Sequence, residues 1–131
     1  MAAGTIFWSA VPLNPPYHSY VEGTSKWVFA RVTTASGASS YANSTVSGNQ
    51  NTIRPQQIGL SGIYEIYSLT SWTWNAAAAV PDAFTLRWDG NKQTLIMSHF
   101  GIVDAGTSGN NELNSTENAG GVLYDVLVRG Y

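Results

Sequence analysis

Apolar side chains alternate with other side chains, position by position, along short segments of this chain, and this pattern constrains its fold most. Segment 26–34 places Val28, Ala30 and Val32 on one side, with aromatic or charged residues between them. Segment 122–131 repeats the pattern, and the residues that share a side there are Val122, Tyr124, Val126 and Val128. A period of two is that of a β-strand with one buried face. The chain is therefore predicted to fold through strands rather than through helices.

Turn-forming residues separate further segments that are rich in β-branched and aromatic residues. Asp89, Gly90 and Asn91 supply the chemistry of a tight hairpin turn between two of them. The expected strands are 5–11, 26–34, 53–58, 63–74, 84–88, 93–100 and 122–131, with a weak edge strand or a loop around 41–46. Seven or eight strands predict one all-β domain, 1–131, built as an antiparallel β-sandwich. Its core is expected to contain Ile63, Ile66, Leu69, Phe84, Leu86, Val126 and Val128.

The chain carries few charges, with six Lys and Arg against eight Asp and Glu and a net charge of −2. The basic residues are scattered singly, so they create no positive field for nucleic acid. No apolar run approaches the roughly 20 residues of a membrane helix, and the first residues lack the parts of a secretion signal. We therefore expect synthesis in the cytoplasm, no membrane insertion and no nucleic-acid partner. The absence of cysteine excludes disulfides and thiolate metal sites.

Residues with catalytic chemistry do not group into a recognisable constellation. His18 lies in a loop rich in proline and tyrosine, and His99 ends an expected strand, so both are interpreted as structural histidines. No G-x-S-x-G nucleophile elbow occurs, and the carboxylates are dispersed. Segment 104–112 is rich in oxygen ligands, but it does not match a calcium-binding loop and is interpreted as a surface turn. The sequence predicts no enzyme, no cofactor and no metal site.

Segment 62–68, Gly-Ile-Tyr-Glu-Ile-Tyr-Ser, resembles the central strand of jelly rolls of the tumour-necrosis-factor and C1q type. In that family the strand follows a turn and precedes a hairpin similar to segment 84–92, and a final apolar strand like 122–131 ends the domain. Segment 101–121 departs from the family pattern. The resemblance implies a jelly-roll-like sandwich that forms a homotrimer through aromatic-rich strands, as in phage fibre tips, capsid decoration proteins and some lectins. It implies no catalytic residues.

Two groups of residues have the chemistry of a sugar site, in which a ring stacks on the sugar while amides and carboxylates bind its hydroxyls. They are Trp72, Trp74 and Asn75 at one strand end, and Trp88, Asp89 and Asn91 at another. The groups would form a shallow saccharide site if both ends lie at one pole of the sandwich. The alternative, which we prefer, is that Trp72 and Trp88 are core rings and Trp74 is a subunit contact, because buried rings dominate such cores.

Two features point to contacts with other chains. The last strand places Leu123 and Leu127 opposite its valines, where either another part of the chain or a second subunit covers them. Segment 1–11 is uncharged and followed by proline, and its large apolar residues are Ile6, Phe7, Trp8 and Val11. This segment is expected to be either an edge strand of its own sandwich or an arm that docks on a neighbouring protein.

Two functions from different classes fit these observations. The first is a non-enzymatic structural protein of a virion, a capsid decoration or fibre-tip subunit that binds other proteins. The 5 Trp, 7 Tyr and 4 Phe exceed what one core of this size needs, so a homotrimer is expected. The second is a soluble lectin on the same fold that binds a surface glycan.

Overall fold

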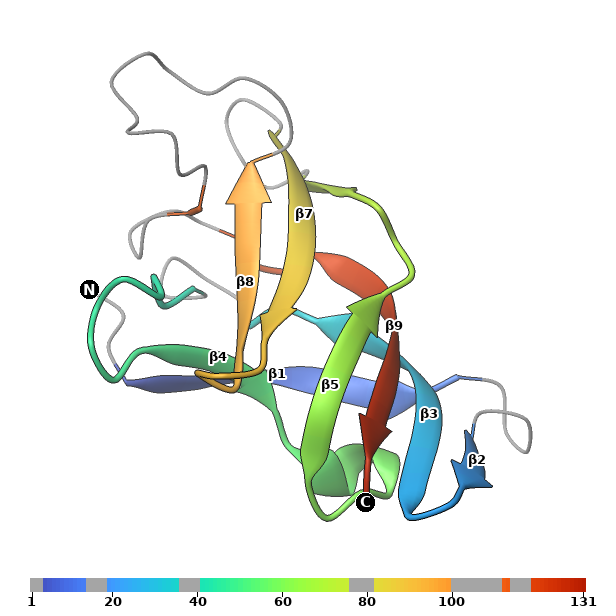
Figure 1. The fold of residues 1–131 in the computed structure, drawn as a ribbon. Coiled ribbons are helices and arrows are strands. Elements are labelled where there is room, and N and C mark those ends of the chain that lie inside the picture. The colour runs from blue at the N-terminus through green and yellow to red at the C-terminus, as the bar shows by residue number, and fades with distance from the viewer. Residues whose placement is uncertain (1–3, 14–18, 36–40, 76–81, 100–111, 114–118) are drawn as a thin grey trace.

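The computed structural model describes residues 4–13, 19–35, 41–75, 82–99, 112–113 and 119–131, and most of these residues form strands (Figure 1). The elements are β1 (Thr5–Pro12), β2 (Ser19–Glu22), β3 (Ser25–Thr33), β4 (Gln50–Ile53), the short 3-10 helix η1 (Pro55–Ile58), β5 (Ile63–Ser68), β6 (Thr73–Asn75), β7 (Asp82–Asp89), β8 (Thr94–His99) and β9 (Leu123–Gly130). The all-β class predicted from the alternating pattern is confirmed.

The strands form two sheets. The larger sheet has the order β4-β1-β3-β9-β5, and β2 pairs with β3 alongside β1. Its pairings are antiparallel except that of β1 with β4, which run parallel to one another. The smaller sheet has the order β6-β7-β8. The expectation of a purely antiparallel fold is therefore wrong at one pairing. The chain between β1 and β4 contains β2 and β3, and a connection of that length is what a parallel pair requires.

The larger sheet is curled, and both of its edges meet the β7–β8 hairpin (Figure 1). Edge strand β4 packs against β8, where the Asn51 N–H donates to Thr94 Oγ1 at 2.8 Å. Edge strand β5 packs against β7, where the Trp88 indole N–H donates to the Tyr64 carbonyl at 3.3 Å. Within the described residues no backbone ladder joins the hairpin to either edge. We call these two contacts the side-chain seams.

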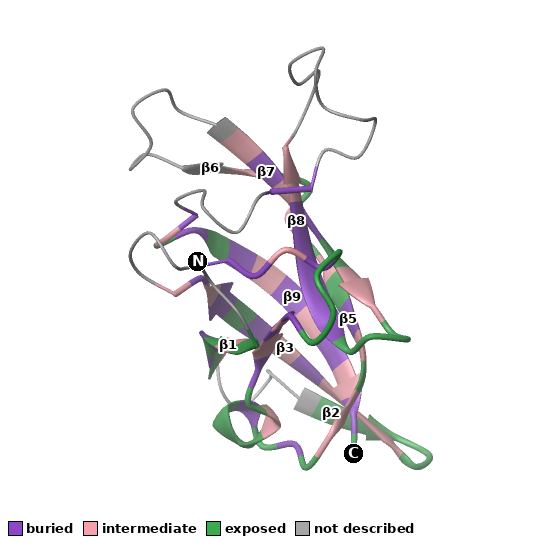
Figure 2. Cartoon of the chain, turned by 90° about the vertical axis from the view of Figure 1, so that its left-hand side faces the viewer, coloured by how far each residue is buried: buried purple, intermediate pink, exposed green. Residues whose placement is uncertain are grey.

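The core lies inside the curl, and residues along β3 and β9 alternate between buried and less buried, with the buried ones supplying much of the core (Figure 2). The positions that the period of two places on one side are all buried, as predicted, and are Val28, Ala30, Val32, Val122, Tyr124, Val126 and Val128. The hairpin contributes Phe84, Leu86, Leu95 and Met97 from above. The core prediction is also confirmed for Ile66, whereas Ile63 is only partly buried.

Leu69 was predicted to be a core residue, and this prediction is wrong because its side chain is 54% exposed. Strand β5 ends at Ser68, whose hydroxyl donates to the Thr70 carbonyl at 2.6 Å, and the chain bends before β6 begins. Segment 63–74 is therefore two strands in two sheets rather than one long strand. The change of sheet breaks the period of two, so the alternation could not be extended past Ser68.

Strand β1 is an interior strand, because it lies between β4 and β3. Its inward side chains Trp8 and Ala10 are 1% and 2% exposed. The interpretation of segment 1–11 as an edge strand is therefore wrong for its described part, and Trp8 fills the core instead of docking on a partner. The actual edge is β4, whose short and mostly polar sequence Gln-Asn-Thr-Ile gives little strand signal.

The β7–β8 hairpin turns at the predicted residues. Asp89 Oδ1 accepts hydrogen bonds from the Asn91 N–H at 3.0 Å and the Lys92 N–H at 3.2 Å, and Asp89 pairs with Thr94 to close the turn. Gln93 has a φ of 55° and is the one non-glycine residue with positive φ in the described part of the chain. The Asp89 side chain thus holds the turn through hydrogen bonds within the turn itself.

Two glycines allow the end of β9 to approach the start of β5 closely. The Tyr131 carbonyl accepts hydrogen bonds from Ser61 at 2.6 Å and from Gly62 at 3.2 Å, and the Tyr131 N–H donates to the Gly62 carbonyl at 3.2 Å. A Cβ added to Gly130 would overlap the Gly62 carbonyl oxygen, and one added to Gly62 would overlap the Tyr131 ring. A side chain at position 130 would meet backbone atoms, whereas one at position 62 would require the exposed Tyr131 ring to move.

Candidate functional site

The outer side of β2, β3, β9 and β5, opposite the core, carries a set of side chains that we call the outer aromatic face. It consists of Tyr20, Trp27, Phe29, Tyr67 and Leu127. Strand pairing creates it, because Tyr20 pairs with Trp27, and Phe29, Leu127 and Tyr67 form one row across three strands. Tyr20 and Tyr67 are 46% and 44% exposed.

The rings of this face are stacked on one another. The centroids of Tyr20 and Trp27 are 6.0 Å apart with an interplanar angle of 4°, and those of Trp27 and Tyr67 are 6.1 Å apart at 15°. Phe29 adds a tilted contact with Tyr20 at 6.5 Å. Such ring pairs hold one another in place beyond the effect of burial alone. The face is therefore an ordered row of rings on the surface of the sheet.

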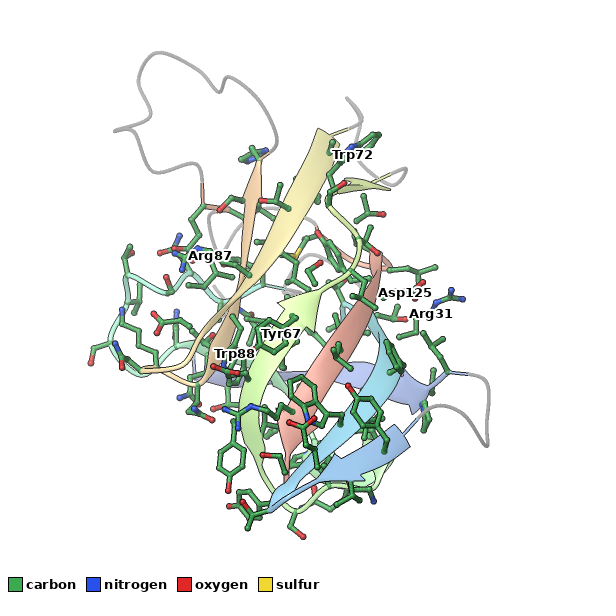
Figure 3. The ribbon with its side chains drawn as sticks, turned by 45° about the vertical axis from the view of Figure 1, so that its right-hand side comes forward. Arg31, Tyr67, Trp72, Arg87, Trp88 and Asp125 are labelled. Carbon is green, nitrogen blue, oxygen red and sulfur yellow. The ribbon has the colours of Figure 1, made fainter. Side chains whose placement is uncertain are left out.

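Two ion pairs flank the outer aromatic face. On one side Arg129 Nε lies 3.2 Å from Glu65 Oε2, and the Tyr67 hydroxyl donates to the same carboxylate. This hydrogen bond, and then Arg129, hold the pKa of Glu65 below its usual value. On another side Arg31 Nε lies 2.8 Å from Asp125 Oδ1 (Figure 3). In each of these two pairs the cation is matched by a carboxylate.

The residues predicted to contact partners lie on the outer surface with two exceptions, Trp8 and Ile6. Leu123 and Leu127 both point outward from β9, and Leu123 is 47% exposed. Phe7 and Val11 are 42% and 52% exposed on the outer side of β1. Ile6 instead packs against the core. The alternation of β1 and β9 thus separates candidate contact residues from core residues.

Trp72 and Trp88 do not come together. Trp72 precedes β6, whose Thr73 pairs with Phe84 near one end of β7, whereas Trp88 lies near the other end of that strand (Figure 3). Trp72 is 44% exposed and is not a core ring. Trp88 packs against the core while it lies partly exposed. One pole of the fold therefore does not unite the two groups that were predicted for a sugar site.

The other members of those groups add little to a common site. Asp89 and Asn91 belong to the hairpin turn, where the Asp89 carboxylate accepts the Asn91 backbone N–H. The side chains of Trp74 and Asn75 lie outside the described part of the structure.

A buried carboxylate, which the sequence suggested only as part of an oxygen-rich turn, belongs to a hydrogen-bond network. Glu112 Oε2 accepts from the Tyr41 hydroxyl at 2.7 Å and the Ser44 N–H at 2.6 Å, and its Oε1 accepts from Ser44 Oγ at 2.6 Å. Burial, and then the hydrogen bond to Glu112, raise the pKa of Tyr41. The Met97 N–H also donates to the Tyr41 hydroxyl, at 3.1 Å. The network fastens segments 41–44 and 112–113 to β8.

The described residues contain no group of His, Cys, Asp and Glu that could hold a metal ion. The rest of the oxygen-rich segment, 104–111, lies outside them, as does His18. His99 packs edge-on against the Phe84 ring with a centroid distance of 5.4 Å.

Comparison with known proteins finds no match for this chain among family models, curated proteins or solved structures. In the described part of the chain, no helix has both the length and the apolar character needed to cross a membrane. Function is therefore argued from the geometry of the fold itself.

Proposed function

We propose that this chain is a non-enzymatic structural protein of a virion, a capsid decoration or fibre-tip subunit with a jelly-roll-like sandwich fold. It acts through protein–protein contacts. The observation that carries the proposal is the outer aromatic face, a partly exposed row of stacked rings on strands whose opposite side fills the core.

The composition of this surface supports a protein partner. Monomeric proteins seldom expose contiguous apolar patches beyond a few hundred Å², and larger ones mark interaction sites. Interface centres are rich in Tyr, Trp and Phe, while charged groups lie at the rim. Here the rings form the centre, and the ion pairs of Arg31 with Asp125 and of Arg129 with Glu65 lie around them.

We further propose that the outer aromatic face joins copies of the chain into a homotrimer. A second copy suits this face because each ion pair beside it is neutral, so that copies meet without net repulsion. Leu123 and Leu127 would be covered by the same contact. Phe7 and Val11 lie on β1, further along the sheet, and would stay available to a capsid or fibre protein.

Light scattering on dilute protein tests the assembly. We expect a mass of about three times the 14.1 kDa of one chain. The variant Tyr67→Glu adds a carboxylate beside Glu65 at a 44% exposed position, so it should fold and yet dissociate into monomers. Val46→Glu places the same charge on a turn outside the sheet, at a 52% exposed residue, and should stay trimeric. A wild-type monomer at micromolar concentration, or a trimeric Tyr67→Glu variant, would contradict the proposal.

Attachment to the particle is a separate measurement. The protein should co-sediment with capsids or fibres of its own virus, and Phe7→Glu should weaken this attachment while the trimer persists. If Phe7→Glu co-sediments as well as the wild type, β1 does not contact the particle. If the wild type does not co-sediment at all, the proposal that the chain is a virion protein is wrong.

A soluble lectin is the second candidate, and the exposure of Trp72 favours it, because a half-exposed indole is a typical stacking platform for a sugar. A glycan array with the purified protein separates the two candidates. Saturable glycan binding that is lost in Trp72→Ala would support the lectin. Absence of binding to any glycan on the array, together with attachment to a particle, would support the structural protein.

A further inference from the structure

A pocket of about 240 Å³ lies where the edge strand β4 comes near the start of β5 and the β7–β8 turn. Its lining residues are Phe7, Gln50, Thr52, Ile53, Pro55, Ile63, Trp88 and Gln93. None of them belongs to the outer aromatic face. Drug-sized ligands occupy pockets of about 300–1,000 Å³, so this pocket suits a single-ring ligand.

The lining combines two aromatic rings with uncharged polar groups. Phe7 and Trp88 supply the rings, and Gln50, Gln93 and Thr52 supply two amides and a hydroxyl. No lining residue is charged. The nearby Arg54 guanidinium lies over the Phe7 ring at 4.0 Å from the centroid. Rings for an apolar face and amides for hydroxyls are the chemistry that recognises a neutral sugar.

The ring of Trp88 is held in one orientation before any ligand arrives. Its indole N–H donates to the Tyr64 carbonyl at 3.3 Å, and the ring packs against the core. A side chain that is already ordered loses less conformational entropy on binding. The polar groups are held similarly, because Gln50 Nε2 donates to the Lys92 carbonyl at 2.8 Å. Its Oε1 accepts only a long contact of 3.5 Å from the Thr5 hydroxyl among the described residues.

The backbone of Gln93 is a second, independent observation. Its φ of 55° lies in the left-handed region, which glycine or asparagine normally occupies in such turns. A glutamine there costs about 1 kcal/mol in backbone strain. Its Nε2 donates to the Gly90 carbonyl at 2.9 Å, which directs the amide along the turn beside the pocket. Glycine would adopt this φ without strain, whereas the Gln93 side chain adds the bond to Gly90 and a polar group at the pocket.

We propose that this pocket binds one neutral hexose ring, with the sugar stacked on Trp88 and its hydroxyls bound by Gln50, Thr52 and Gln93. The inference is independent of the assembly proposed above, and it would give the lectin candidate a site other than Trp72. A single ring contacted in so small a pocket implies a dissociation constant on the order of 1 mM.

Nuclear magnetic resonance titration of the ¹⁵N-labelled protein with glucose, galactose and N-acetylglucosamine tests the proposal. The indole N–H signal of Trp88, assigned by its loss in Trp88→Phe, should shift saturably with at least one of these sugars. Gluconate, an open-chain sugar acid of similar size, should bind more weakly because it has no ring face to stack on Trp88 and because no lining residue is charged.

The variant Gln93→Gly separates a ligand-binding role from a structural one. Because it removes the amide and relieves the strain, it should bind the sugar at least about tenfold more weakly while its stability stays equal or rises. Asn91→Gly is the matched control, an exposed amide in the same turn that does not line the pocket, and should bind like the wild type. The proposal is overturned if no sugar shifts the Trp88 signal, if gluconate binds best, or if Gln93→Gly binds as tightly as the wild type.

Discussion

Replacing Asn51 by alanine should destabilise the fold by about 2–6 kcal/mol. The Asn51 side chain is fully buried, and its Oδ1 accepts from the Ala42 N–H at 2.8 Å. Its Nδ2 donates to the Ala42 carbonyl at 2.8 Å and to the Leu95 carbonyl at 3.1 Å. Alanine leaves both backbone groups of Ala42 without these partners, whereas Leu95 keeps a long bond from Thr94 at 3.4 Å. Two unsatisfied buried groups at about 1–3 kcal/mol each give the expected range.

Equilibrium unfolding in urea, followed by tryptophan fluorescence at one fixed protein concentration, measures this loss. Gln50→Ala is the matched control on the same strand. The Gln50 amide bonds to Lys92 in solvent, so its loss should cost less than about 1 kcal/mol. Asn51→Asp keeps the acceptor for Ala42 but turns the donor into an oxygen that faces two carbonyls. It should therefore cost at least as much as alanine.

A loss below about 1 kcal/mol for Asn51→Ala, with an unchanged dependence on urea, would refute this reasoning. It would mean that water replaces the amide and that the Asn51 side chain adds little to the β4–β8 seam beyond the backbone bond to Thr94. A large loss of unfolding free energy in Gln50→Ala would likewise refute it, because it would show that burial does not determine how much each amide contributes to stability.

Three further measurements address the core, the strand ends and the tyrosines. Leu86→Ala should lower the free energy of unfolding by about 2–5 kcal/mol because Leu86 is 7% exposed. Leu69→Ala, at a position that is 54% exposed, should change it by less than about 1 kcal/mol. Similar losses for the two variants in urea unfolding would mean that the buried and exposed sides of these segments have been assigned wrongly. Gly130→Ala should reduce the yield of folded protein in circular dichroism, because the added Cβ meets a backbone carbonyl that cannot move aside; a wild-type melting curve would contradict the close approach. Burial raises the pKa of Tyr41 and Tyr124 above about 10, so the unfolded chain releases these protons first. The contribution of these tyrosines to stability should be constant below about pH 10 and fall above it by up to about 1.4 kcal/mol per pH unit for each tyrosine. Urea unfolding between about pH 9 and about pH 11 should show a shallower fall in Tyr124→Phe, and equal slopes would contradict it.

The parts of the fold that could be predicted from the sequence are those that local alternation determines. Strands β3 and β9 have one buried side and one exposed side over their whole length, so the period of two placed Val28 and Val126 correctly. The hairpin at Asp89 was equally local, because its carboxylate bonds to the next turn residues. The break after Ser68 could not be read, since both halves of that segment have strand composition.

The remaining features depend on which strands become neighbours. Tyr41 and Glu112 are 71 positions apart, and no local pattern pairs a tyrosine with so distant a carboxylate. The outer aromatic face was predicted only where a single strand determines it, as at Leu127 on β9. Its row of rings could not be predicted, because it depends on the order of β2, β3, β9 and β5 in the sheet. That order brings Tyr67 beside Trp27. The pocket around Trp88 likewise exists only because β4 meets the hairpin.

The seam at β4 also bears on self-association. An unpaired strand edge is a template on which another molecule can add its own strand, and this is a common start of aggregation. At β4 the Asn51 N–H donates to the Thr94 hydroxyl, whose single proton is shared between the Asn51 carbonyl at 3.3 Å and the Leu95 carbonyl at 3.4 Å. The hydroxyl occupies the Asn51 N–H without offering a further strand edge in turn, which opposes strand addition at this residue. Loosening of the β7–β8 hairpin would uncover β4, which makes Thr94 a position where a small change in sequence would alter solubility more than shape.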